Sequence, residues 1–67
     1  MEFLFTRHAR QRMIERGVSV SEVEQAVQKG SKQLQAKDRL VSNYGYINVV
    51  YRKLKDRIVV ITVKMRW

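Results

Sequence analysis

The sequence contains no cysteine, no proline and only one histidine. The absence of cysteine excludes disulfide bonds, zinc fingers and iron–sulfur clusters, and a single histidine does not provide a multi-histidine metal site. We therefore expect no cofactor and no bound metal. The longest largely apolar run, residues 58–63, has six residues including Thr62, far below the ~18 that a membrane-spanning helix needs. The N-terminus also lacks a signal-peptide pattern, so we expect a cytoplasmic protein with no membrane partner.

Acidic residues are scarce as well. Six Asp and Glu stand against 14 Lys and Arg, which leaves a net charge of +8. A small domain with this charge repels itself unless anions are near, and the usual anions are nucleic-acid phosphates, acidic proteins and anionic lipids. We expect a nucleic acid first and an acidic protein second. The alternative that the charge serves only solubility stays open.

No linker composition and no internal repeat interrupt the 67 residues, so a single domain is expected over residues 1–67. A chain of this length buries only about 60% of the surface that its unfolded form exposes. Without disulfides or a metal, its stability has to come from packing, and a homodimer is one open way to add to it.

Two helices are expected in the first half of the chain, with a turn at Gly17 between them. Thr6 can cap the first helix, and Gly17 can supply the left-handed residue that ends it. Ser19 and Glu22 have the spacing of a capping box at the start of the second helix, which Gly30 closes. The apolar positions expected to face the core are Ala9, Met13, Val20, Val23, Ala26 and Val27.

After Gly30 the apolar residues alternate, as they do in strands. Short strands are expected on both sides of a turn at residues 37 and 38, followed by a hairpin of residues 47–52 and 58–66. The sequence therefore predicts an α+β fold of the order α-α-β-β-β-β, with the two N-terminal helices packed on one face of a four-stranded, mostly antiparallel sheet.

Alternation in the hairpin also predicts which side chains face the helices. The expected inward residues are Ile47, Val49, Tyr51, Val59, Ile61, Val63 and Met65. This arrangement would pair Val49 with Ile61 and Tyr51 with Val59. A shift of one residue would move one whole set to the other face.

The first helix carries the residues best suited to chemistry. His8 and Arg12 are one helical turn apart, and Arg16 continues the same side. An imidazole can transfer a proton near neutral pH, and a guanidinium can bind a phosphate oxygen, so the pair suits phosphodiester chemistry. The alternative stays open that His8 is an ordinary first-turn residue and that the arginines are solvated or paired with Glu15.

Further candidates for binding a nucleic acid lie in the second half of the chain. The cations Arg52, Lys64 and Arg66 can hold phosphates, and the aromatic rings of Tyr46 and Trp67 can stack on bases. The opposite interpretation is that the cations are only solvated and that Trp67 covers a sheet edge.

Since the chain has no glycine-rich phosphate loop and no cysteine nucleophile, the hydrolytic chemistry that remains is metal-independent RNA cleavage by the 2′-hydroxyl of the substrate.

The segment from His8 to Gly17 resembles the signature H-A-x-x-R-M-x-x-R-G of a small family of domains of unknown function. The resemblance covers nearly the whole chain, and through that family it extends to the RelE, ParE and BrnT toxins. It implies a RelE/ParE-like domain and a toxin-type endoribonuclease, with RNA as substrate and an acidic antitoxin as partner. By position, His8 and Arg12 match the polar pair of the signature.

The chain also departs from the toxin pattern, because no histidine lies on its last expected strand. ParE-like relatives are not ribonucleases, and a shared fold does not define an activity. Two other functions therefore stay open: a non-catalytic module that binds nucleic acid or an acidic protein, and an inactive toxin relative that acts only through protein contacts.

Overall fold

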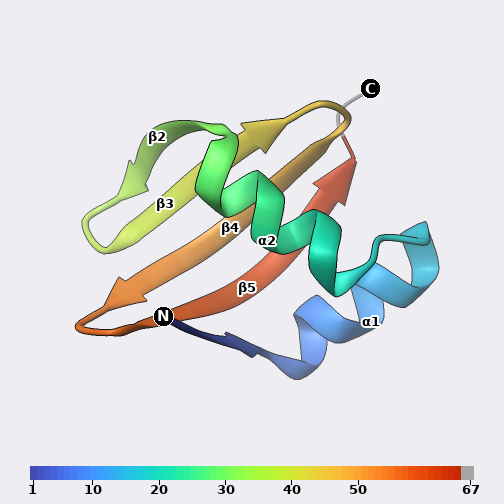
Figure 1. Cartoon of the computed structure of the whole chain (residues 1–67), viewed down its shortest axis with the longest axis horizontal. Helices are drawn as coiled ribbons and strands as arrows, with labels where there is room; N and C mark the ends of the chain where they lie inside the picture. Colours follow the sequence, from blue (N-terminus) through green and yellow to red (C-terminus); the bar gives the residue numbers. More distant parts are fainter. Residues whose placement is uncertain (66–67) are drawn as a thin grey trace.

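The part of the chain that the structure describes consists of a five-stranded sheet and two helices. The computed structural model describes residues 1–65. In chain order its elements are β1 (Glu2–Phe5), α1 (Arg7–Arg16), α2 (Val20–Lys29), β2 (Ser31–Ala36), β3 (Arg39–Tyr44), β4 (Ile47–Leu54) and β5 (Arg57–Met65). Figure 1 shows α2 lying across one face of the sheet and α1 lying beside β5. Neither helix within residues 1–65 has the length and apolar character needed to cross a membrane.

The predicted four-stranded sheet is wrong, because the chain begins with a strand. The sheet has five strands in the order β1-β5-β4-β3-β2. It is mixed, since β1 runs parallel to β5 while the other neighbours are antiparallel. β1 has only four residues, and its partner lies more than fifty residues away along the chain, so no local hairpin signal marks it. The α+β class and the two helices of the prediction are confirmed.

Local hydrogen bonds at the helix ends explain why both helices were predictable. The Thr6 hydroxyl accepts a hydrogen bond from the Ala9 N–H at 3.0 Å and caps α1. Gly17 ends α1 in the left-handed conformation, with a φ of 67°. Ser19 and Glu22 form the expected capping box, with hydrogen bonds of 3.1 and 3.0 Å. Such caps need only residues three or four apart, so they can be read from the sequence.

Gly30 closes α2 as predicted, for a reason that the sequence does not reveal. Its φ is −73°, which any residue can adopt. A Cβ at this position would instead collide with the carbonyl oxygen of Ala26 and the hydroxyl of Ser42, and it would lie 2.8 Å from the carbonyl oxygen of Asn43. The fully buried Ser42 hydroxyl donates its hydrogen bond to Ala26 O at the same place. Gly30 is therefore required for the close approach of α2 to β3.

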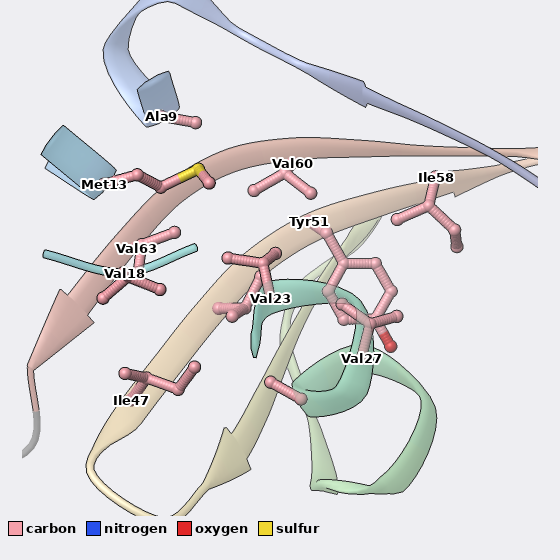
Figure 2. Close-up of a cluster of buried hydrophobic side chains, with 12 residues drawn as sticks. Ala9, Met13, Val18, Val23, Val27, Ile47, Tyr51, Ile58, Val60 and Val63 are labelled. Atoms are coloured by element: carbon pink, nitrogen blue, oxygen red, sulfur yellow. The ribbon is translucent and has the colours of Figure 1, made fainter. Parts of the chain in front are cut away.

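The hydrophobic core lies between the helices and the sheet, as Figure 2 shows. Its members are Ala9, Met13, Val18, Val23, Ala26, Val27, Ile47, Val49, Tyr51, Ile58, Val60 and Val63. Val20 was predicted to belong to this core but is 49% exposed, because it is the first residue of α2 and lies at the end of the buried stripe, where it lines an open hollow together with the exposed Ile14. Tyr51 is almost completely buried, and this burial raises the pKa of its phenol by disfavouring the charged form.

A β-bulge in β5 changes the predicted facing of half of that strand. Val50 pairs with Thr62, but the next residue of β4, Tyr51, pairs with Val60, so that Ile61 has no residue opposite it. The extra residue inverts the alternation. The predicted inward position of Val59 is therefore wrong.

The register across the β4–β5 hairpin therefore also differs from the predicted one. Val49 pairs with Val63 rather than with Ile61, and Tyr51 pairs with Val60 rather than with Val59. The buried residues of the first half of β5 are consequently Ile58 and Val60, in place of the predicted odd-numbered set.

Candidate nucleic-acid interface

Among the described residues, the second half of β5 has a neighbouring strand, β4, on one side only, and α1 lies along its other side. β1 pairs with β5 only as far as the Phe5–Val60 pair. At Thr6 the chain leaves the sheet and enters α1, which packs against β5 through the buried Ala9 and Met13. Figure 1 shows the blue α1 on the side of the red β5 that faces away from β4. The polar side of α1 thus lies next to the last residues of β5.

A groove of about 320 Å³ runs between these two elements. Its lining residues from α1 are His8, Arg12 and Arg16, and those from β5 are Thr62, Val63, Lys64 and Met65. The three residues of α1 are spaced four apart, so they follow one side of the helix. The structure therefore brings four of the predicted site residues, from opposite ends of the chain, to one surface.

The groove is positively charged. Arg12, Arg16 and Lys64 contribute three cations, and no acidic residue is found among the described residues that line it. The guanidinium of Arg12 contacts the carboxylate of Glu15 at 3.3 Å, as one interpretation of the sequence allowed. Both side chains of this pair are exposed to solvent, and such pairs contribute at most about 1 kcal/mol. A phosphate can therefore compete for Arg12.

Tyr46 lies beside the groove. It belongs to the turn between β3 and β4, and it lines a second hollow of about 310 Å³. Arg16 and Met65 line both hollows, so the two are adjacent. Tyr46 is 71% exposed.

Arg52 does not join the group. It lies on β4 opposite Val59, and its guanidinium pairs with Asp38 at 3.2 Å. Lys64 lies opposite Asn48. Asn48 precedes Arg52 by four residues on β4, so Lys64 and Arg52 are about 13 Å apart along the strand direction. Alternation predicted the shared face of these two cations but did not reveal that they lie at different ends of it. The candidates Arg66 and Trp67 lie outside the described residues.

Some residues of the two hollows were not singled out from the sequence. Thr62 lines the groove, and its position two residues before Lys64 was a usable signal, because alternate residues of a strand share a face. Glu22 and Gln25 line the second hollow. Neither could be placed there from the sequence, since α2 meets the β3–β4 turn only through tertiary packing.

The fold and the groove define a small basic α+β domain with a positively charged groove. Residues 5–64 match the model of the family described as a domain of unknown function (DUF4258), and the chain belongs to that family. The match confirms the predicted membership of a family of domains of unknown function. The relation to the RelE and ParE toxins stays a prediction. No curated protein and no solved structure matches the chain significantly.

Proposed function

We propose that the protein is a metal-independent endoribonuclease of the toxin type, which binds the RNA backbone in the groove between α1 and β5. One observation carries this proposal: the only histidine of the chain shares a groove with Arg12, Arg16 and Lys64. A proton-transferring group surrounded by phosphate-binding cations is what RNA cleavage requires. The proposal places the protein in the cytoplasm, where RNA is accessible to it.

In the proposed reaction the 2′-oxygen of the substrate forms a bond to the adjacent phosphorus, and the bond from phosphorus to the 5′-oxygen breaks. His8 in its neutral form accepts the proton of the 2′-hydroxyl, and water protonates the departing 5′-oxygen. Arg12 stabilises the additional negative charge on the phosphorus oxygens, while Lys64 holds a flanking phosphate. The products are a 2′,3′-cyclic phosphate and a 5′-hydroxyl end.

A cleavage assay in the presence of a metal chelator tests the proposal. We expect the native protein to produce 2′,3′-cyclic phosphate ends. His8→Ala and His8→Gln should cleave at least about 100-fold more slowly than the native protein. Gln11→Ala is the matched control, because Gln11 is an exposed residue of α1 that does not line the groove. Equal cleavage by the native protein and both His8 variants would exclude the mechanism.

A different surface favours a second candidate function, a module that binds an acidic protein such as an antitoxin. A shallow apolar groove of about 440 Å³ lies at the other side of α1, and its lining includes Phe5, Met13 and Val18 together with the cation Arg10. Ile14 also lines it and is 82% exposed. An acidic segment with apolar side chains would complement both the groove and the net charge of +8.

The two candidates are distinguished by separate variants. Ile14→Ser is expected to weaken binding of an acidic partner protein without changing RNA cleavage, because Ile14 lies outside the groove of His8. If Ile14→Ser abolishes cleavage as completely as His8→Ala while remaining folded, the division into two surfaces is wrong.

A further inference from the structure

The hollow beside the groove is lined by aromatic, apolar and polar side chains. Tyr44, at the end of β3, and Tyr46, in the β3–β4 turn, line it together with Glu22 and Gln25 of α2. Its apolar lining is formed by Val18, Ile47 and Met65. A flat apolar ligand with hydrogen-bonding groups at its edge matches this combination.

We propose that this hollow binds one unpaired nucleobase of the RNA strand whose backbone lies in the neighbouring groove. The inference rests on the proposed function and adds the substrate class, which is single-stranded RNA read at one base. Because Arg16 and Met65 line both hollows, a phosphate held by Arg16 has its own base or that of the next nucleotide within reach of Tyr46.

Stacking on an aromatic ring is the main contribution expected from Tyr46. Every base has an aromatic face, and such stacking strengthens binding of single strands. Tyr46 lines the hollow and is 71% exposed, so a base can reach it without displacing the core. Stacking of this kind requires a base that has left its duplex, which excludes double-stranded RNA as the preferred ligand.

Hydrogen bonds to the edge of the base are expected from Glu22 and Gln25, which lie one turn apart on α2. Oε1 of Glu22 already accepts a hydrogen bond from the Ser19 N–H at 3.0 Å. The capping box therefore holds this carboxylate in place, and its other oxygen can accept from an amino group of a base. The amide of Gln25 can both donate and accept.

Binding of synthetic RNA strands tests the inference. An eight-nucleotide strand with 2′-O-methyl groups cannot be cleaved by the proposed mechanism, so its Kd can be measured at equilibrium. We compare it with a strand of equal length and charge that lacks bases, and with a duplex. The base-containing single strand is expected to bind about tenfold more tightly than the abasic strand, with the same dependence on salt.

Variants of residues that line the hollow test whether it causes the tighter binding of the base-containing strand. Tyr46→Ala should remove most of the tenfold preference, and Tyr46→Phe should keep it because the ring remains. Gln25→Ala should reduce the preference, whereas Gln28→Ala, on the same helix but outside both hollows, should not. Leu34→Ala, another exposed apolar position, is the control for Tyr46→Ala.

Each of the other outcomes would exclude either the base site or the proposed function. Equal binding of the two single strands would show that the hollow binds no base, while the phosphate groove and the proposed function would remain. A duplex that binds as tightly as the single strand would also exclude the base site. If no strand binds, the proposed function fails and the inference fails with it.

Discussion

Thr6 is hydrogen bonded to the bulged residue of β5, Ile61. Its hydroxyl donates to the carbonyl oxygen of Ile61 at 2.9 Å and accepts from the N–H of Ala9 at 3.0 Å. The backbone N–H of Thr6 also donates to Val60 O at 3.1 Å. One residue therefore caps the helix that carries His8 and attaches this helix to the strand that carries Lys64.

We expect Thr6 to be a positioning residue for the groove. Thr6→Ala removes the cap and the link to β5, so it should lower the free energy of unfolding by about 1–2 kcal/mol. It should also reduce kcat of RNA cleavage more than it raises KM, because His8 loses its position relative to the bound phosphate. Thr6→Ser retains the hydroxyl and should restore both properties.

Ser19→Ala is the matched control for Thr6→Ala. It removes the cap of α2, with a similar cost in stability, but Ser19 has no hydrogen bond to β5 among those described for residues 1–65. If Ser19→Ala lowers kcat as much as Thr6→Ala does, the effect of Thr6 comes from stability alone.

The cations of the groove should determine how RNA binding depends on salt. Each phosphate contact to a single strand contributes about −0.7 to the slope of log K against log salt concentration. Arg12→Ala, Arg16→Ala and Lys64→Ala are each expected to reduce the slope by about that amount. Arg52→Ala should leave it unchanged, since Arg52 pairs with Asp38 away from the groove. Filter binding or fluorescence anisotropy at several salt concentrations measures the slope, and equal slopes for all four variants would contradict the assignment.

Gly30 should tolerate substitution poorly. In Gly30→Ala the added Cβ meets Ala26 O and the Ser42 hydroxyl, and α2 has to move away from β3. Overpacking of this kind costs about 1–3 kcal/mol. Gly45→Ala provides the comparison, because Gly45 has a φ of 57° but no atom of the described residues, its chain neighbours aside, within 4 Å of an added Cβ, so only backbone strain of about 1–2 kcal/mol is expected. Urea unfolding measures the free energy of unfolding of both variants. If Gly30→Ala is as stable as the native protein, the close approach of α2 to β3 is contradicted.

Tyr51 should make the protein less stable in alkaline solution. Burial raises the pKa of Tyr51 above its ordinary value of 10.0, so the unfolded chain releases this proton at a lower pH than the folded chain does. The stability linked to Tyr51 is fully present below about pH 10 and is lost as the pH rises from there through the pKa of the folded state.

The measurement is the free energy of unfolding from pH 8 to pH 11. Tyr51→Phe has no ionisable phenol and should lose less stability over this range than the native protein. Parallel curves for native protein and Tyr51→Phe would refute the linkage.

Prediction from the sequence succeeded where the necessary interactions were local. The caps at Thr6 and Ser19, and the left-handed Gly17, involve residues within a few positions of one another. The spacing of His8, Arg12 and Arg16 placed them correctly on one side of a helix for the same reason. Family membership rested on that same continuous string and is confirmed.

Tertiary structure decided what local patterns do not contain. β1 is a strand because β5 is available beside it, and β5 is far away in the sequence. The bulge at Ile61 depends on the pairing of β5 with β4, so alternation within β5 alone predicted the wrong facing for Val59. The position of Arg52, far from Lys64 on the same face, likewise follows from the register between two strands.

The amino-acid sequence by itself determined the two helices, the positive charge and the row of polar residues on α1, because these depend on composition and on neighbours within one helical turn. The groove was decided only by the tertiary structure. β1 ends at Phe5, so that within residues 1–65 the last part of β5 has no strand on the side opposite β4, and α1 lies there. Strand pairing across more than fifty residues brings His8 next to Lys64, and no local pattern encodes such a distance.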